Sequence, residues 1–350
     1  MRFFNQGAPG VEWMPDQPDV TLPIRPRIEV DDAVYPPACP ACQGDLDIDG
    51  YCLTCGQKAP SLREHFELEP ADWVAGVCDI GLTHVRNEDA MATLATGQRA
   101  VLVVCDGVTT SEDSDVASLA AARTACDALW TRDPQGTGTP SSRTAAIQAV
   151  LTEAVAAANQ AVVDATATDS PNAAATTIAI AVIDDQAVHC ANLGDSRVYW
   201  LPDGGEPRQL TKDHSLAQDG IDSGAGRAEA EASAFAHTIT RWLGCDAVDL
   251  TPHLATLERD VAGWLVVCTD GLWNYASEAA AILEVLDQVR GDDESPRRVA
   301  AGLVAWANQQ GGQDNVTVVC ARLAAQGEPG SSTETMPTDT PGPADESPRE

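Results

Sequence analysis

The stretch AVLVVCDG, residues 100–107, decides the fold of this chain. It runs through apolar residues and a cysteine without a break and ends on an acid, Asp106, followed by a glycine. A run of this length that is rich in valine predicts a β-strand buried on both faces. Asp106 would then lie at the end of a buried strand, where the chain turns.

Three other segments repeat this pairing of a buried strand with an acid at its end. WLVVCTDG, residues 264–271, delivers Asp270, and GGQDNVTVVC, residues 311–320, places Asp314 just before a strand. The acids Glu88 and Asp89 follow the apolar segment 73–78. A turn explains any one of these acids, because Asp-Gly is a common turn dipeptide. Four such strand ends together are harder to attribute to turns.

Acids gathered at one end of a core need compensation. Carboxylates repel one another unless they are protonated or bound to cations, and the chain has only two lysines, Lys58 and Lys212. A set of ligands made of oxygen alone suits Mg²⁺ or Mn²⁺. The pattern therefore predicts a two-metal hydrolytic centre.

The composition excludes several classes of partner. The 350 residues carry a formal net charge of −32, which argues against sequence-independent binding of nucleic acid and against an anionic membrane surface. No apolar run approaches the roughly 20 residues that span a bilayer, and the N-terminal MRFFNQGAPG lacks the apolar core of a signal peptide. An odd number of cysteines, 11, argues against a disulfide framework. We expect a soluble cytoplasmic protein with no nucleic-acid or membrane partner.

The chain divides into five segments by composition. Residues 1–37 are a Pro-rich flexible arm, residues 38–60 a compact cysteine unit, and residues 61–70 a linker. Residues 71–324, in which strand-like and helix-like stretches alternate, form the main domain. Residues 325–350 are rich in Ser, Thr, Pro and Glu, and we expect an acidic disordered tail.

The cysteine unit has the spacing of a zinc site. Cys39 and Cys42 form one Cys-x-x-Cys pair, and Cys52 and Cys55 form a second pair after nine residues. Four thiolates so placed can close a tetrahedron around one Zn²⁺, with no open position for catalysis. A redox pair is the alternative. We expect a small zinc ribbon, resembling known ribbons, that is structural or docks a partner.

The order of elements in the main domain predicts its architecture. Helical periodicity follows residue 115, continues over about 142–166, and returns at about 278–289 and 296–309, while strands fill most of the remainder. Residues 217–233 are small and polar and indicate a surface flap. Many strands with two separate helix pairs predict an α+β fold in which two packed sheets are flanked by helices.

Several of these segments resemble the metal-dependent serine/threonine protein phosphatase family, type 2C. The matching motifs occur in the family's order and are DIGLTHVRNEDA (79–90), VVCDG (103–107), ANLGDSR (191–197), LTKDHS (210–215), TITRWLG (238–244), CTDGLW (268–273) and GGQDNVTVV (311–319). The resemblance implies a four-layer α-β-β-α sandwich of two antiparallel sheets, with the metals at one end. The ribbon, the arm and the tail lie outside it.

The resemblance also implies a role for each acid. Asp106 would bridge two Mn²⁺ or Mg²⁺ ions, Glu88 and the carbonyl of Gly107 would bind one of them, and Asp270 and Asp314 the other. Asp89 would hold a water bound to the metals. Water activated by the two ions would attack phosphorus in line, with no phosphoenzyme. The turn at Asp195 and the side chain of Asn315 would shape nearby loops.

Two departures from the family pattern affect the binding of phosphate. The position at which family members carry a phosphate-binding Arg holds His84, and Arg86 lies two residues later, so either could grip phosphate. After Asp106 and Gly107, the loop VTTS replaces the glycines and the histidine of many members.

The implied function is hydrolysis of phosphoserine and phosphothreonine in proteins, with a Ser/Thr kinase and its substrates as candidate partners. Two other phosphatase classes are rejected. Cys126 and Arg132 match the spacing of cysteine phosphatases but have no glycine cradle, and Asp106 lacks the second acid of haloacid-dehalogenase-type enzymes. The remaining alternative is a pseudophosphatase or scaffold that binds signalling partners through the ribbon and the tail.

Overall fold

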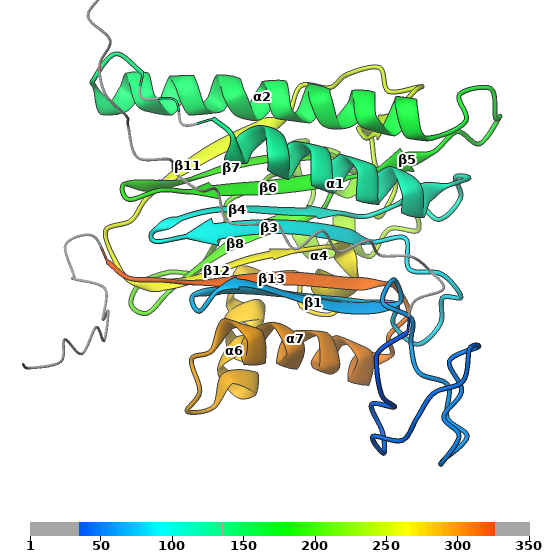
Figure 1. Ribbon diagram of the computed structural model, residues 1–350. Helices are drawn as coiled ribbons and strands as arrows, with labels where there is room; N and C mark the ends of the chain where they lie inside the picture. Colours follow the sequence, from blue (N-terminus) through cyan, green and yellow to red (C-terminus); the bar gives the residue numbers. More distant parts are fainter. Residues whose placement is uncertain (1–34, 133, 135, 326–350) are drawn as a thin grey trace, which may run out of the picture.

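The computed structural model describes residues 35–132, 134 and 136–325 (Figure 1). The Pro-rich arm and the acidic tail expected from the sequence fall almost entirely outside the described residues. Within them, two antiparallel β-sheets pack face to face between two pairs of helices. This arrangement confirms the predicted four-layer α+β sandwich.

The sheets are formed by strands from distant parts of the chain. The six-stranded sheet has the order β1-β2-β13-β12-β8-β9, with β1 (His65–Ala71), β2 (Val74–Asp79), β13 (Val316–Leu323), β12 (Gly263–Cys268), β8 (Arg197–Pro202) and β9 (Arg208–Gln209). The five-stranded sheet has the order β11-β7-β6-β4-β3, with β11 (His253–Glu258), β7 (Ala187–Leu193), β6 (Ile178–Ile183), β4 (Arg99–Cys105) and β3 (Ala90–Thr96). A separate pair joins β10 (Leu243–Gly244) to β5 (Ala175–Thr176).

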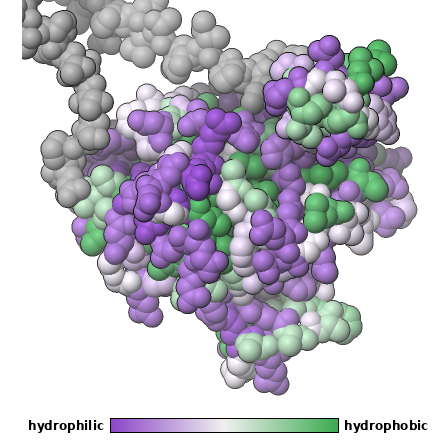
Figure 2. Space-filling model, turned by 90° about the horizontal axis from the view of Figure 1, so that it is seen from below, coloured by the Kyte–Doolittle hydropathy of each residue, from purple (hydrophilic) through white to green (hydrophobic). Residues whose placement is uncertain are grey.

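Helices cover the outer face of each sheet. On the five-stranded sheet lie α1 (Ser114–Trp130) and α2 (Pro140–Ala165), and on the six-stranded sheet lie α6 (Ala279–Arg290) and α7 (Pro296–Gln310). Three shorter helices are α3 (Leu216–Asp222), α4 (Arg227–Glu231) and α5 (Asp270–Trp273). By length and composition α2 could cross a membrane, but here its apolar face packs against the sheet. Seen from the side of α6 and α7, the surface is mainly hydrophilic with small apolar groups (Figure 2).

Strand β4 is buried on both faces, as its sequence predicts. Every residue from 100 to 105 has an exposed fraction of 0%. Alternate side chains point to opposite faces of a strand, so Val101, Val103 and Cys105 join the cluster under α1 and α2. Leu102 and Val104 join the cluster between the two sheets. The strand therefore contacts two of the three core layers and fixes the position of Asp106 at its end.

The stretch expected as a linker, residues 61–70, differs from that expectation. Residues 65–70 belong to β1, which pairs with β2 at the edge of the six-stranded sheet. Phe66 is buried and Leu68 half-buried in the core between the sheets, and they alternate with Glu67 and Glu69. This period of two is the signature of a half-buried strand, so most of the stretch belongs to the main domain.

The flap and the first central strand also differ in detail. Residues 217–233 contain the short helices α3 and α4 instead of irregular structure alone. Between β5 and β6, Thr177 donates its backbone N–H to the carbonyl of Asp106 at 2.8 Å. That bond fixes the backbone at the end of β4.

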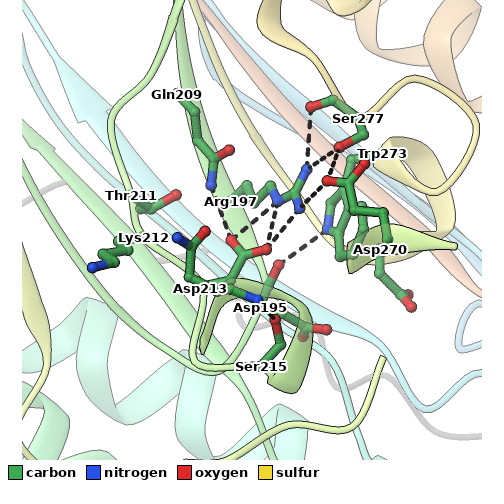
Figure 3. A network of polar contacts seen from close by, with 12 residues as sticks. Asp195, Arg197, Gln209, Thr211, Lys212, Asp213, Ser215, Asp270, Trp273 and Ser277 are labelled. Atoms are coloured by element: carbon green, nitrogen blue, oxygen red, sulfur yellow. Dashed lines mark hydrogen bonds and ion pairs between the residues drawn. The ribbon is translucent and has the colours of Figure 1, made fainter. Parts of the chain in front are cut away.

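A buried arginine ties β8 to α5 and to the flap (Figure 3). The guanidinium of Arg197 donates to both carboxylate oxygens of Asp213, with its closest contact at 2.7 Å, and lies 3.6 Å from the ring centre of Trp273. It also donates to the carbonyl of Ser277, whose hydroxyl bonds Glu231 of α4. Trp273 belongs to α5, so this network holds the short helix that begins at Asp270.

We predict that Asp213→Ala destabilises the protein by about 3–5 kcal/mol, because it leaves the Arg197 charge buried without its partner. The neighbouring Lys212→Ala is the matched control, since Lys212 is half-exposed in its ion pair with Asp222 and such pairs contribute less than about 1 kcal/mol. Urea unfolding measures both free energies. Equal small changes would contradict the assigned role of the network.

Candidate active site

The acids predicted to converge come from four strand ends at one end of the sandwich. The end of β2 and the start of β13 are adjacent, since Asp79 pairs with Val316. The end of β12 lies beside the same part of β13, since Cys268 pairs with Val318. In the facing sheet, the end of β4 pairs with the start of β3. The sheets thus place Glu88, Asp89, Asp106, Asp270 and Asp314 at a common edge.

Burial and mutual repulsion raise the pKa values of three of these carboxyl groups. Burial, followed by the charges of Asp270, Asp89 and Asp314, holds the pKa of Asp106 well above its usual range. Burial also raises the pKa of Asp89 to about 8. For Asp314, burial and then Asp270 raise the pKa to about 6. The raised pKa values of these three carboxyls thus have burial as their first cause and the charge of neighbouring acids as a further one.

Two residues without carboxylates hold the loops of this end together. Asn315 accepts the backbone N–H of Glu88 at 2.8 Å and donates to the carbonyls of Ile80 and Arg86. Gly107 donates its N–H to the carbonyl of Glu88 at 3.2 Å. A Cβ at Gly107 would lie 2.6 Å from the carbonyl oxygen of Ser114, so only glycine fits. Asn315 therefore has the loop-shaping contacts expected of it.

Asp89 is held by two threonines. Its Oδ2 accepts the hydroxyl of Thr269 at 2.7 Å and that of Thr317 at 2.8 Å. These residues lie at the end of β12 and within β13, so the side chain is fixed by both strands. No sequence pattern marks these two threonines, because a single Thr in a strand is common.

The two candidates for binding phosphate, His84 and Arg86, contact different acids of the cluster. His84 Nε2 lies 3.3 Å from Asp314 Oδ1. Arg86 donates to Glu88 Oε1 at 2.6 Å and pairs with Asp115 at 3.3 Å. Burial opposes ionisation of Glu88, but the bonds from Arg86 and Ser114 outweigh it and lower the pKa of that carboxyl. The side chains of His84 and Arg86 thus each contact a different acid of the cluster.

Arg63 is a residue that the sequence analysis missed. Its guanidinium, 4% exposed, donates to the backbone carbonyl of Asp89 at 2.6 Å and to that of Asp115 at 3.4 Å. The side chain of Asn87 returns a bond to the carbonyl of Arg63 at 3.1 Å. The segment after the cysteine unit is therefore joined to the loop that carries Glu88 and Asp89. The contact joins residues 26 apart, and no sequence pattern marked it.

Asp195 is a further acid of this region. The sequence suggested a structural turn, yet its carboxyl is 4% exposed. Burial, then Asp270 and Asp213, hold its pKa well above the usual range. Its carbonyl accepts the indole N–H of Trp273 at 3.0 Å (Figure 3).

The donor set fits divalent cations. Glu88 Oε2 is buried and has no hydrogen-bond partner among the described residues, although a buried carboxylate oxygen without a partner is costly. The acids around it offer oxygen ligands only, which hard cations prefer. Among the described residues, these carboxylates do not form a group in which all ligand atoms lie within 4.8 Å of one another. The strand pairings bring them to one end of the sandwich without such a tight group.

The four cysteines of the N-terminal unit do form such a tight group. The sulfur atoms of Cys39, Cys42, Cys52 and Cys55 all lie within 4.8 Å of one another, and none is in a disulfide. Backbone N–H groups of Cys55 and Thr54 point at the Cys52 sulfur and lower the pKa of its thiol to about 6. This is the geometry of a Cys₄ metal site.

Comparison with known proteins points to one family, the protein phosphatases. The family model described as protein phosphatase 2C matches residues 83–307. Protein phosphatase PhpP of Streptococcus pneumoniae is 34% identical over 145 residues, which are 41% of this chain and 56% of the relative. The match thus spans little more than half the length of that relative.

Two solved structures are similar over nearly their whole length. The serine/threonine phosphatase PstP/Ppp of Mycobacterium tuberculosis has a TM-score of 0.60 at 29% identity, with 72% of this chain and 98% of that chain covered. The catalytic domain of PstP in complex with two manganese ions has a TM-score of 0.54 at 27% identity, with 72% and 97% covered.

We predict that Mn²⁺ raises the thermal midpoint of the protein and that Asp106→Asn abolishes this rise. A cation present at about 100 times its dissociation constant stabilises the folded state by about 2.7 kcal/mol. In EDTA the variant should be at least as stable as the wild type, because it carries one charge fewer among the crowded acids. Differential scanning calorimetry measures the midpoints.

The exposed acid Asp260, near the start of β12 and far from this end, provides the control. Asp260→Asn should retain the full response to Mn²⁺. A response that survives in Asp106→Asn would mean that the cation binds elsewhere.

Proposed function

The chain belongs to the protein phosphatase 2C family, and we propose on this basis that it hydrolyses phosphoserine and phosphothreonine in proteins with divalent cations. The observation that supports this most is the convergence of acids at one end of the sandwich, with the unpartnered Glu88 Oε2 among them. A site with this many carboxylates repels a phosphate dianion unless bound cations offset the repulsion.

We assign the ligands of two Mn²⁺ or Mg²⁺ ions as follows. Asp106 would contribute to both, Glu88 and the carbonyl of Gly107 would hold one, and Asp270 and Asp314 would hold the other. When bound, such ions lower the pKa of water and offset charge on the transferred phosphoryl group. The manganese-bound relative supports this choice of ion.

The remaining polar groups orient the reactants. Asp89 accepts the hydroxyls of Thr269 and Thr317 through Oδ2. Its Oδ1 would then be the oxygen that holds a water molecule. His84 beside Asp314 and Arg86 beside Glu88 can each donate to a phosphate oxygen held between them. Arg86 is always charged, whereas His84 contributes a charge only when protonated.

The partners and the location follow from this activity. We propose that the substrates are phosphorylated proteins, with a Ser/Thr kinase acting in the opposite direction. We place the protein in the cytoplasm, since none of the cysteines in the described part of the chain is in a disulfide and reduced cysteines suit a reducing compartment.

Activity is tested on p-nitrophenyl phosphate and on phosphoserine and phosphothreonine peptides with Mn²⁺. We predict that Asp106→Asn and Asp270→Asn each lower kcat/KM by about a hundredfold or more, since several kcal/mol of charge stabilisation are lost. Asp260→Asn should remain fully active. If the wild type has no turnover that depends on Mn²⁺, the chain acts as a pseudophosphatase or scaffold.

For the cysteine unit we propose one structural Zn²⁺ held by four thiolates. The turn between the two pairs contains Gly50 at φ +82°, and Gly56 directly after the second pair has φ +75°, a region where glycine is favoured. We predict about one zinc per chain by mass spectrometry of metals, and a clear loss in Cys52→Ser. The exposed Cys245 lies outside this cluster, so Cys245→Ser should retain the zinc. A metal-free protein with four freely titratable thiols would contradict the ribbon.

We also propose that Arg63 is a positioning residue for this centre, through the carbonyls of Asp89 and Asp115. Arg63→Ala should lower kcat and raise the Mn²⁺ concentration needed for half-maximal activity, each by about 10–100-fold, as for other groups that support metal ligands. Arg63→Lys should rescue little, because an ammonium cannot reach both carbonyls in the same planar geometry.

Arg297→Ala is the matched control for Arg63→Ala. It removes an exposed arginine that contacts Glu67 of β1 at 2.7 Å without touching the metal loop. If both variants lose stability but Arg63→Ala keeps its Mn²⁺ requirement, then Arg63 is merely structural.

A further inference from the structure

A pocket opens beside the acidic end of the sandwich. Its volume is about 230 Å³. Val108 lines it and is two residues from Asp106 in the chain, so the two Cα atoms lie within about 7.6 Å. A substrate side chain bound in this pocket would therefore be close in sequence to the phosphorylated residue that reacts near Asp106.

The walls of the pocket are fixed by hydrogen bonds. Val108 donates its N–H to the carbonyl of Ala175 at 2.9 Å, and Ser111 Oγ accepts the N–H of Ala175 at 3.2 Å. On the other side, Trp242 directly precedes β10, which pairs with β5 through Leu243 and Thr176. The loop after β4 and the segment that carries Trp242 are thus joined through β5. The pocket is preformed, as ligand sites usually are.

The lining combines an aromatic ring with one negative charge. Val108, Pro171, Ile239 and Trp242 supply apolar surface, and Asp246 is the charged residue of the lining. The indole N–H of Trp242 donates to Asp246 Oδ1 at 2.8 Å, which holds the ring and the carboxylate together. None of the lining residues is basic.

This combination suits a cation on an aliphatic stem. Lysine and arginine place their methylene groups on apolar surface and keep the charge at a polar rim, and a cation is attracted to the face of a tryptophan. The charge of the chain, −32, also attracts basic partners. A glutamate would be repelled by Asp246, and a leucine would offer no charge to attract it.

We propose that this pocket binds a lysine or arginine side chain of the substrate, within about three residues of the phosphorylated serine or threonine. The inference rests on the proposed phosphatase function and adds a substrate class to it: phosphorylation sites with a basic residue nearby. The pocket then selects among phosphoproteins, while the acids and their cations do the chemistry.

The experiment compares phosphopeptides that differ at one position, with Arg, Leu or Glu placed in turn at each of the three positions on either side. We expect kcat/KM for the best Arg peptide to exceed that for the matched Glu peptide about tenfold, with Leu between them. Hydrolysis of p-nitrophenyl phosphate, which fills no pocket, reports the chemistry alone. Peptide affinity measured in parallel by fluorescence anisotropy tests the preference even without turnover.

Two acids three residues apart give a matched pair of variants. Asp246→Asn should bring the ratio of Arg to Glu close to one and leave p-nitrophenyl phosphate hydrolysis unchanged, and Asp246→Lys should reverse the preference. Asp249→Asn removes the same charge from an acid that pairs with Arg241 outside the pocket, and should keep the preference. Trp242→Ala should weaken the Arg peptide most.

Three results would overturn the proposal. The first is an equal kcat/KM for the Arg, Leu and Glu peptides, and the second is a kcat/KM for the Leu peptide that equals that for the Arg peptide. The third is an equal loss of the Arg preference in Asp246→Asn and Asp249→Asn, which would point to the overall charge instead of the pocket. Failure of the proposed function is distinguishable, because it would abolish p-nitrophenyl phosphate hydrolysis and leave the affinities to decide on the pocket.

Discussion

Repulsion among carboxylates at one end of the sandwich is the constraint on which the rest of the structure depends. Five acids reach this end from four strand termini, and burial together with their mutual charge raises the pKa of Asp106, Asp89 and Asp314. Such an arrangement opposes folding unless the scaffold is rigid and positive charge is supplied. The rigid part is the β-sandwich, whose central strands are buried on both faces. Arg86 supplies positive charge at the rim, and the buried Glu88 Oε2 has no hydrogen-bond partner among the described residues.

The positions of these acids depend on close contacts that tolerate little change. Gly107 lies against the carbonyl of Glu88, and a Cβ at Gly271, next to Asp270, would lie 2.0 Å from the carbonyl oxygen of Asn315. Asn315 bonds three backbone groups of the facing loop. From the other side, Arg63 joins the segment after the cysteine unit to the same loop. The four-cysteine unit is thus connected by a short, ordered segment to the loop that carries Glu88 and Asp89.

Much of this could be predicted from the sequence, because the signals are local. Uninterrupted apolar runs predicted β4, β12 and β13, the acids at their ends predicted the cluster, and two Cys-x-x-Cys pairs predicted the grouping of four sulfurs. The rest depends on contacts between residues that are distant in the chain. Arg63 lies in a stretch that resembled a linker, and its partner is 26 residues away. The pairing of Arg86 with Asp115, the burial of Asp195 and the pocket at Trp242 likewise arise only when separate segments meet.

The central claim is that acids far apart in sequence bind a pair of divalent cations at one edge of the sandwich. The most direct test is a crystal grown with Mn²⁺ and measured at the manganese absorption edge. The account predicts two anomalous peaks, one between Asp106 and Glu88 and one between Asp106 and the pair Asp270 and Asp314. Peaks only at other sites, or no peak at this end in a crystal that contains Mn²⁺, would contradict it.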